Sequence, residues 1–281
     1  MQTPRSLFNG QPADSVGIFD RGLLYGDGLF ETLAVRGGGV CLWSMHLERL
    51  LWGAERLGIP APESGLLRAE VKRLLSDDAL DGVLRITLTR GEGGRGYRGP
   101  SAPNPSRIMS WYPELPSAVG TRRQGISVRL CRWRLGDNPA LAGIKHLNRL
   151  EQVLARSEWD DPAVVEGLMA DACGNIICGT MTNVFLLGDD GLITPRIDRC
   201  GIAGTVRRLV FQEAEKLGMA VREQTLGPAA LFRTPALFLT NSVLGPVAVA
   251  SLDGHVYDPR SYPLALLEAV GDRTFKPELM T

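Results

Sequence analysis

The chain has few of the residues that mark several common functional classes. It has five cysteines without a C-x-x-C pair, and three histidines, none at the spacing of zinc ligands. The G-x-S-x-G elbow and the P-loop are also missing. These absences argue against a disulfide framework, a protein-built zinc site and the common hydrolase and nucleotide sites. The cysteines are therefore expected to be reduced thiols of a cytoplasmic protein.

Net charge and long apolar runs are lacking as well. Lys plus Arg and Asp plus Glu both number 31, so no overall field favours nucleic acid or an acidic membrane. No apolar run approaches the roughly 20 residues that span a bilayer, and the first residues lack the apolar core of a signal peptide. With 281 residues, 44% of them apolar, the chain can form one large or two modest globular domains.

The first third of the sequence predicts a small sheet with two helices. Residues 28–35 alternate as a strand, and residues 40–43 are its expected hairpin partner across three glycines. Ser44 is the expected N-cap of a helix that Gly58 ends. The expected buried stripe of this helix is Leu47, Leu50, Leu51, Ala54 and Leu57. A second helix is expected at 66–75, and further strands at 83–89 and 108–111.

A linker rich in proline and glycine is predicted at residues 113–123. It separates an expected small N-terminal α/β domain, residues 1–112, from a larger C-terminal domain, residues 124–281. The fold class expected is therefore a two-domain mixture of α+β and α/β structure. In the second domain, strands are expected near 125–131, 164–170, 182–187, 219–224 and 236–241, and helices at 146–158, 205–217 and 261–271.

One lysine lies where an apolar run meets an expected helix start. Lys145 precedes a set of apolar residues at helical spacing, namely Leu147, Leu150, Val153 and Leu154, which predict a buried face. A lysine near apolar groups loses part of its preference for the charged form, and a neutral amine is a nucleophile. The alternative is a surface lysine whose stem covers apolar surface while its charge stays in water.

A glycine turn at residues 201–204 indicates anion binding, because it opens a helix with Arg207 and Arg208 in its first turn. Helix N-termini favour anions, and cations there oppose the macrodipole. A bound phosphate would resolve this conflict. The alternative is that both arginines face solvent or pair with Asp198.

Residues 90–98 place three arginines among glycines. Glycines let a backbone bend closely around a ligand, and arginine forks bind carboxylates. The alternative is a solvated hairpin tip.

Four segments, in order along nearly the whole chain, resemble fold-type IV pyridoxal-phosphate enzymes, the group of branched-chain aminotransferases, D-amino-acid transaminases and aminodeoxychorismate lyases. Residues 20–32, DRGLLYGDGLFET, are similar to its N-terminal signature, and residues 46–50, HLERL, to its phosphate-arginine segment. Residues 90–97, RGEGGRGY, and 141–152, LAGIKHLNRLEQ, are similar to the lyase branch in particular. The resemblance implies the fold-type IV fold and pyridoxal 5'-phosphate as cofactor.

The resemblance also implies a role for each matching residue. Lys145 would bind the cofactor covalently and act as the proton-transfer base, and Arg49 would hold the phosphate. Further implied cofactor-binding residues are Cys178, Gly204, Thr205, Val206, Thr240, Asn241 and Ser242. Implied substrate-binding residues are Tyr25, Arg90, Arg95 and Tyr97. No metal is implied, and the family usually forms homodimers.

Two positions depart from the family pattern. Aminotransferases of the family often have a threonine where Val206 stands, so only its backbone N–H is expected to reach the phosphate. The family normally has a glutamate where Cys178 stands, and that carboxylate pairs with the protonated pyridine nitrogen, which makes the ring an electron sink. A thiol with a pKa of about 8.5 is mostly neutral and a weak acceptor, so Cys178 is expected to hold a pyridinium less well.

The activity expected from the resemblance is that of a 4-amino-4-deoxychorismate lyase, which gives 4-aminobenzoate and pyruvate for folate synthesis. One alternative is an aminotransferase that acts on D- or branched-chain amino acids. Another is a cofactor-binding relative with impaired turnover, and a third is an unrelated α/β protein. The partners expected are a small-molecule substrate and a second copy of the chain, but neither nucleic acid nor a membrane.

Overall fold

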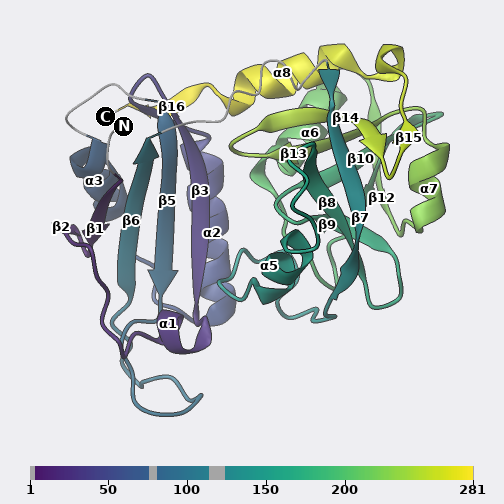
Figure 1. The fold of residues 1–281 in the computed structure, drawn as a ribbon. Helices are drawn as coiled ribbons and strands as arrows, with labels where there is room; N and C mark the ends of the chain where they lie inside the picture. Colours follow the sequence, from purple (N-terminus) through teal and green to yellow (C-terminus); the bar gives the residue numbers. More distant parts are fainter. Residues whose placement is uncertain (1–3, 76–80, 114–123, 281) are drawn as a thin grey trace. The chain divides into compact units, whose positions relative to one another are not determined.

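The computed structural model describes residues 4–75, 81–113 and 124–280. The chain divides into two compact units (Figure 1). The first contains Met1–Leu115, Ile144–Asn148 and Phe275–Thr281, and the second contains Pro116–Gly143 and Arg149–Thr274. The expected domains 1–112 and 124–281 differ from these units, because the segment with Lys145 and the C-terminal strand belong to the first unit. The expected linker, residues 113–123, lies outside the described residues except for Pro113, which ends a strand.

The first unit is built on a seven-stranded sheet of order β16-β4-β3-β5-β6-β1-β2, in which all described pairings are antiparallel. Its strands are β1 (Arg5–Phe8), β2 (Gln11–Pro12), β3 (Gly28–Arg36), β4 (Gly39–Cys41), β5 (Gly82–Thr89), β6 (Ser106–Pro113) and β16 (Pro277–Met280). Its helices are α1 (Arg21–Tyr25), α2 (Trp43–Leu57) and α3 (Ser64–Leu75). Alternating apolar residues of β3, β5 and β6 form the core with α2 and α3, including Leu33, Leu84, Met109, Trp111 and Leu67. This sheet is the support for the residues around Lys145.

The start of α2 corrects the expected strand at 40–43 and the expected cap at Ser44. The strand β4 ends at Cys41, and Leu42 is the N-cap residue with a left-handed φ of 49° and no side-chain cap bond. Leu42 and Trp43 are buried in the core, so packing overrides capping chemistry at this end. The N–H of Ser44 instead bonds to Oε2 of Glu278, at 2.9 Å, from the distant strand β16. The C-terminal end agrees with expectation, because Gly58 caps the helix with a φ of 61°.

The second unit is built on a mixed sheet of order β12-β11-β10-β13-β14-β7-β8-β9, with β15 paired to β14. Its strands are β7 (Ile126–Leu135), β8 (Val164–Asp171), β9 (Ile176–Gly179), β10 (Asn183–Gly188), β11 (Gly191–Pro195), β12 (Ala220–Gln224), β13 (Leu237–Asn241), β14 (Gly245–Leu252) and β15 (His255–Val256). Its helices are α5 (Leu150–Arg156), α6 (Thr205–Lys216), α7 (Pro228–Arg233), the 3₁₀ turn η1 (Pro259–Ser261) and α8 (Leu264–Thr274). The expected strands and the helices at 205–217 and 261–271 are confirmed with shifts of a few residues.

The helix expected at 146–158 is wrong in its first half. It begins only at Leu150, because the residues before it pair with β3 as an extended segment. The expected buried face is also wrong, since Leu150 and Val153 are 69% and 57% exposed. The short helix buries only Ala155. Helical spacing of apolar residues therefore does not mark the core here.

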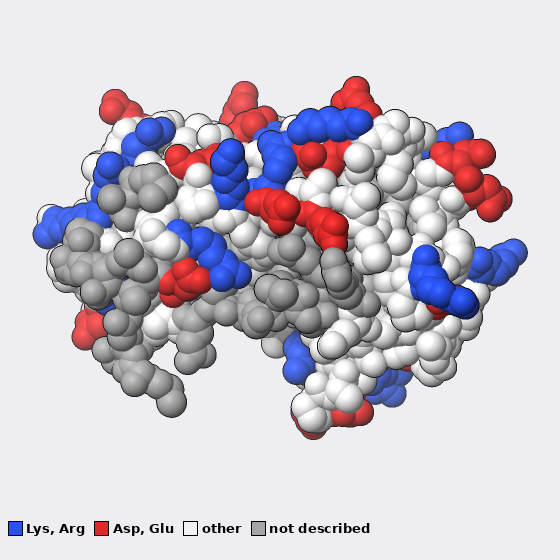
Figure 2. Space-filling view, turned by 90° about the horizontal axis from the view of Figure 1, so that it is seen from above, with Lys and Arg blue, Asp and Glu red and all other residues white. Residues whose placement is uncertain are grey.

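Charged side chains of both signs are interspersed on the face shown in Figure 2. This distribution agrees with the equal numbers of basic and acidic residues, 31 each. Among the described helices, none is long and apolar enough to cross a membrane.

Candidate active site

Lys145 lies on the extended segment that pairs with the start of β3. The N–H of Phe30 donates to the carbonyl of Lys145 at 3.0 Å, and the N–H of Leu147 donates to the carbonyl of Gly28 at 2.9 Å. These bonds fix the backbone on both sides of the lysine. Its Nζ lies 4.1 Å from the centroid of the Phe30 ring. The lysine is therefore half-buried against an aromatic face, on backbone that the sheet holds in place.

Arg49 is held by a buried carboxylate. Its Nε donates to Oε1 of Glu31 at 2.8 Å and its Nη2 to Oε2 at 2.5 Å, which forms a bidentate pair. Nδ1 of His46 lies 2.6 Å from Oε2 of the same carboxylate. Burial raises the pKa of Glu31, but the charges of Arg49 and His46 outweigh it and lower the pKa to about 2. The arginine therefore has a permanent anionic partner that orients its fork.

His46 stays in the neutral form more readily than an exposed histidine. Burial lowers its pKa; Glu31 opposes this shift, and the charges of Arg49 and Lys145 add to it. Because the charges of Lys145 and Arg49 both lower the pKa of His46, these three side chains of the first unit interact electrostatically.

Sequence reasoning missed Glu31, although a signal for it was present. In the strand β3, Leu29, Glu31, Leu33 and Val35 alternate onto one buried face. A carboxylate in that series had to be buried, and a buried carboxylate requires a partner. The alternation of β3 together with the pairing of buried charges therefore predicts that Glu31 has a charged partner near the candidate site.

The guanidinium of Arg90, which was expected to bind a substrate carboxylate, is bound to groups of the chain itself. Its Nε and Nη2 donate to Asp27 at 2.8 and 3.0 Å. It also donates to the carbonyls of Leu57, at 2.8 Å, and Gly58, at 2.7 Å. These acceptors belong to the chain itself, so Arg90 supports the loop that follows β5. Its expected role at a substrate carboxylate stays a prediction.

The other three residues expected at the substrate lie in or against that loop. Arg95 and Tyr97 are exposed, with Tyr97 at 89%. The hydroxyl of Tyr25 accepts a bond from the N–H of Gly96 at 3.2 Å, and its ring meets the ring of Tyr97 edge to face at 5.6 Å. Tyr25 therefore contacts the loop through its hydroxyl and its ring, while the side chains of Arg95 and Tyr97 are exposed to solvent.

The expected phosphate residues of the second unit converge at the start of α6. Gly204 is its N-cap residue and makes no side-chain cap bond, so the first N–H groups of the helix, from Thr205 and Val206 on, have no intrahelical acceptor. A Cβ at Gly204 would lie 2.1 Å from Oδ1 of Asn183, so only glycine fits there. In the sheet, Asn183 pairs with Thr240. The buried hydroxyl Oγ1 of Thr240 has no hydrogen-bond partner among the described residues.

The two neighbours of Thr240 that were expected at the phosphate lie in the same turn. The side-chain oxygen of Asn241 accepts bonds from the N–H groups of Val243, at 3.0 Å, and Leu244, at 2.6 Å, so it shapes this turn. Ser242 is half-buried within it. The hydroxyl of Thr240 and the backbone N–H groups at the start of α6 are thus donors of the second unit that suit an anion.

Arg207 resolves the conflict at the helix start in a way that was not expected. It pairs with Glu223 and donates to the carbonyl of Pro195 at 3.0 Å. Its partner is therefore an acid on β12 rather than Asp198. The charge of Arg207 is neutralised within the protein, so an anion at the start of α6 would be bound by backbone N–H groups.

Cys178 is a buried, neutral group. It lies on β9, pairs with Met169 of β8, and is 6% exposed. Burial raises the pKa of its thiol to about 12, and the neighbouring Cys200 and Glu166 add to the shift while Arg149 opposes it. The thiol is therefore protonated at neutral pH, which agrees with the neutral thiol expected from the sequence.

Glu166 is a buried carboxylate that sequence reasoning did not single out. It accepts bonds from the N–H of Gly167, the N–H and hydroxyl of Thr180, the N–H of Met181 and the hydroxyl of Thr182. Five donors saturate its acceptor positions. Although it lies close enough to influence Cys178, this carboxylate is committed to the turn after β9 and does not replace the glutamate missing at residue 178.

Within the described part of the chain, no three His, Cys, Asp or Glu side chains are grouped to hold a metal ion. The potential ligands are instead used in pairs with arginines or in turns, as Glu31, Asp27 and Glu166 are. The groups described above are an amine and an arginine fork in the first unit, and helix N–H groups in the second.

Comparison with known proteins agrees with this set of groups. The amino-transferase class IV family matches residues 28–252. An aminodeoxychorismate lyase of Vibrio harveyi is 31% identical over 245 residues, which cover 87% of this chain and 90% of the relative. A protein of Methanocaldococcus jannaschii described as a putative branched-chain-amino-acid aminotransferase is also 31% identical over 245 residues, covering 86% of this chain and 84% of the relative.

A solved structure extends the likeness to three dimensions. The 4-amino-4-deoxychorismate lyase of Pseudomonas aeruginosa has a TM-score of 0.86 and 42% sequence identity, covering 94% of this chain and 96% of the other. Both units are thus included in the match. With a fold-type IV architecture and a family match over most of its length, the chain belongs to the amino-transferase class IV family.

Proposed function

We propose that this protein is a 4-amino-4-deoxychorismate lyase, which converts its substrate to 4-aminobenzoate and pyruvate with pyridoxal 5'-phosphate. The observation that carries the proposal is the 42% identity to the Pseudomonas aeruginosa lyase over 94% of the chain. The loop sequence at residues 90–98 supports the same branch, because a substrate with two carboxylates requires cationic side chains.

Each unit, taken by itself, has groups with the chemistry that the cofactor requires. Lys145 offers an amine for its aldehyde, and the fork of Arg49, oriented by Glu31, suits a phosphate. The uncapped start of α6 and the unpartnered hydroxyl of Thr240 provide further phosphate donors. When bound, pyridoxal phosphate supplies an electron sink for the substrate carbon that bears the amine.

In the proposed reaction, Lys145 is the group that moves the proton. Its amine takes the proton from the amine-bearing ring carbon of the substrate, and the enolpyruvyl group leaves with the electron pair of its C–O bond. The ring becomes aromatic, which drives the elimination. The released enolpyruvate takes a proton at carbon and becomes pyruvate, so no amino acceptor is consumed.

The chain's other residues orient and bind. The sheet pairing of residues 145–147 with β3 fixes the lysine backbone, and the Phe30 ring limits its movement on one side. We assign Arg95 and Tyr97 to the substrate carboxylates, since they are two of the exposed polar side chains of the loop that Tyr25 supports.

A coupled assay tests the proposal. The purified protein with cofactor should release equal amounts of 4-aminobenzoate and pyruvate without any added keto acid. The substitution Lys145→Ala should abolish the absorbance of the lysine-bound cofactor and lower turnover by about three orders of magnitude or more. A borohydride-reducible lysine adduct that persists in this variant would contradict the assignment of Lys145.

A second candidate function is branched-chain aminotransferase activity, which the 31% identity to the Methanocaldococcus jannaschii protein favours. An aminotransferase returns its proton to the cofactor and requires a keto acid as amino acceptor. Turnover that depends strictly on an added keto acid would therefore decide for this candidate and against the lyase.

We further propose that the protein acts as a homodimer in the cytoplasm. Four apolar side chains around α1 support the dimer, because Ile18, Phe19, Leu23 and Leu24 are exposed by 47% to 68%. The five cysteines support a reducing compartment, since all of them are free thiols.

A further inference from the structure

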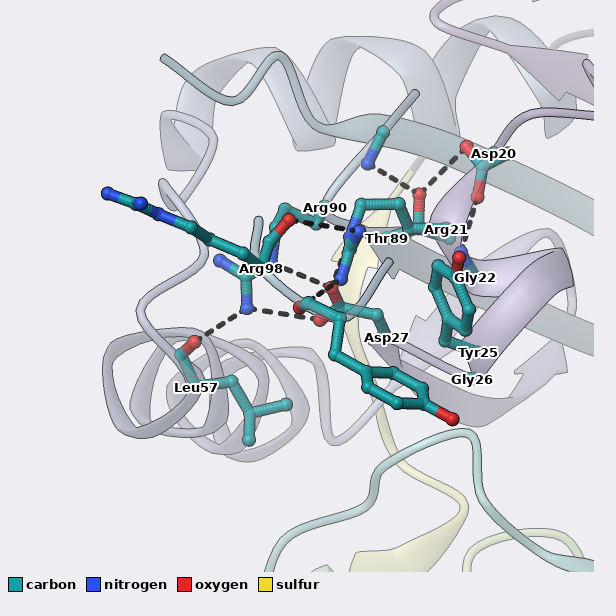
Figure 3. Close-up of polar contacts among 12 residues, drawn as sticks. Asp20, Arg21, Gly22, Tyr25, Gly26, Asp27, Leu57, Thr89, Arg90 and Arg98 are labelled. Carbon is teal, nitrogen blue, oxygen red and sulfur yellow. Dashed lines mark hydrogen bonds and ion pairs between the residues drawn. The ribbon is translucent and has the colours of Figure 1, made fainter. Parts of the chain in front are cut away.

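The loop between β5 and β6 is folded around the guanidinium of Arg21. This arginine begins α1 and is only 3% exposed. It donates to the backbone carbonyls of Gly96 at 3.0 Å and Tyr97 at 2.8 Å, with a longer contact to that of Arg98 at 3.5 Å. Three successive carbonyls of the loop thus converge on one buried cation (Figure 3).

Asp27 balances this cation and a second one. Its Oδ2 accepts from Nε of Arg21 and Nε of Arg90, both at 2.8 Å. Burial raises the pKa of Asp27, but the bonds from Arg90 and Arg21 outweigh it, so the pKa is lowered and the carboxylate stays ionised. One anion therefore fixes the positions of both arginines.

The ends of the loop are joined by another buried carboxylate. Oδ2 of Asp20 accepts from the hydroxyl of Thr89, where β5 ends, at 2.9 Å, and from that of Ser106, where β6 begins, at 2.7 Å. Its Oδ1 accepts from the N–H of Gly22 at 2.7 Å, which caps α1 (Figure 3). The loop base and the helix that carries Arg21 are thus one hydrogen-bonded assembly.

Two glycines of the loop, Gly93 and Gly96, suit its conformation around Arg21. A Cβ at Gly93 would lie 2.8 Å from Cδ of Arg21. Gly96 has a φ of +99°, which side-chain-bearing residues rarely adopt. The glycine-rich backbone bends around an arginine of the same chain, where the sequence led us to expect a ligand. Consequently the side chains at residues 95, 97 and 98 are exposed.

We infer that Arg21 is a positioning residue, which sets the loop so that Arg95 meets the carboxylate of a dianionic substrate. This inference rests on the proposed function, in which Arg95 binds that group. Arg21 touches neither substrate nor cofactor in this role; it acts by holding carbonyl oxygens. A fork is needed because its separate N–H groups serve Asp27 and the loop carbonyls at the same time.

The substitution Arg21→Lys removes the forked guanidinium but keeps a positive charge. A lysine keeps the positive charge beside Asp27 but cannot donate to the carbonyls in the fixed geometry of a guanidinium. We expect the KM for 4-amino-4-deoxychorismate to rise by about tenfold to a hundredfold while kcat and the absorbance of bound cofactor stay near wild type. Trypsin should also cleave after Arg95 or Arg98 faster than in the wild type.

Arg107→Lys is the matched control. Arg107 lies on β6 of the same sheet, and its guanidinium forks to Glu70, with Nη2 to Oε1 at 2.8 Å. Its KM and trypsin pattern should equal those of the wild type. Should Arg21→Lys fail to fold, Gly93→Ala displaces Arg21 from the loop side without a change of charge. It should give the same rise in KM.

A double-mutant cycle decides whether Arg21 acts through Arg95. In an Arg95→Ala background, Arg21→Lys should change KM by less than about threefold, because the group that it positions is gone. An equal effect of Arg21→Lys in both backgrounds, or a wild-type KM in the single variant, would overturn the inference. Failure of the wild-type protein to release 4-aminobenzoate would be a different result, since it would reject the proposed lyase function itself.

Discussion

The prediction that Cys178 faces the pyridine nitrogen of the cofactor raises the question of how that nitrogen would be held. The thiol is neutral, since its pKa is raised to about 12 by burial and by nearby Cys200 and Glu166. Glu166 cannot move to the nitrogen without releasing donors of the turn at residues 180–182. Arg149 is a cation whose charge affects the pKa of Cys178, and the same charge would repel a protonated pyridine ring there. The site therefore offers little support for a protonated ring.

We predict that Cys178→Glu accelerates proton abstraction by about tenfold or more, because each 1.36 kcal/mol of added carbanion stabilisation is a factor of ten in rate. Arg149 would also help to keep the new carboxylate ionised. Stopped-flow spectroscopy measures the rate, and Cys178→Gln is the control, being of equal size without charge.

An equal rate in both Cys178 variants, with normal folding and cofactor binding, would show that the electron sink is not limiting. Normal cofactor absorbance with no product in the wild type would instead support the alternative of impaired turnover. Glutamate is larger than cysteine and the site is buried, so a thermal melt must accompany the assay.

The pKa of Glu31 predicts how acid affects stability. It is about 2 in the folded chain and 4.5 in the reference state, so the stabilisation it provides is present above pH 4.5 and is lost as the pH falls toward 2. Between these values the free energy of unfolding of the cofactor-free wild type should fall more steeply than that of Glu31→Gln. Urea titrations at several pH values measure both, and parallel pH profiles would contradict the prediction.

Single residues differ in how far the sequence reveals them. Lys145 and Arg49 follow from motifs, and Glu31 follows from the alternation of β3. Arg21 has no such signal, because α1 has only five residues and shows no periodicity. Its burial depends on carbonyls that lie 75 to 77 residues away in sequence. Contacts of this kind are set by tertiary structure, and composition alone indicated only a cationic, glycine-rich loop.

At the scale of elements, the turn after β9, residues 180–182, is held in place by hydrogen bonds to Glu166. Hydrogen bonds to a charged acceptor contribute roughly 1.5–3 kcal/mol each, and buried donors left unpaired are costly. We predict that Glu166→Gln lowers the free energy of unfolding by about 3 kcal/mol, since an amide nitrogen replaces one acceptor oxygen. Urea denaturation measures the loss.

Glu215→Gln is the matched control for this prediction, because Glu215 is an exposed acid on α6. It should change stability by less than about 0.5 kcal/mol. Equal stability of the Glu166 variant and the wild type would show that the turn holds without the carboxylate.

Element boundaries were predictable where local chemistry sets them and not where pairing does. Gly58 ends α2 as its conformational freedom requires. The residues before α5 become extended because β3 offers them a partner, and no helix propensity of their own prevents this. The strands β11 and β14 were not expected, since their short apolar runs lack a clear alternation with polar residues.

At the scale of the whole molecule, the exposed apolar side chains around α1 predict self-association. We expect Phe19→Glu to shift the protein from dimer toward monomer in sedimentation velocity, because it places a charge in the proposed contact. Val256→Glu is the control, as Val256 is 74% exposed and belongs to the second unit. A dimer of unchanged stability in the Phe19 variant would place the interface elsewhere.

The sequence predicts a division into two domains at the proline- and glycine-rich stretch 113–123, which lies outside the described residues except for Pro113, so this boundary stays a prediction. The return of residues 144–148 and 275–281 to the first unit was not predictable, because both depend on strand pairing with distant segments. Lys145, which we propose as the catalytic lysine, is thus carried by a short segment that returns to the first unit, and a linear division into domains does not detect it.

The way in which Arg21 holds its loop has a consequence for how this loop can be engineered. A backbone carbonyl is the same whatever side chain follows it, so residues 95, 97 and 98 can be exchanged while Arg21 keeps its acceptors. In this chain the loop thus combines a buried anchor with exposed side chains. We expect substitutions at residues 95, 97 and 98 to cost little in folding, which makes the segment a natural place to engineer new specificity.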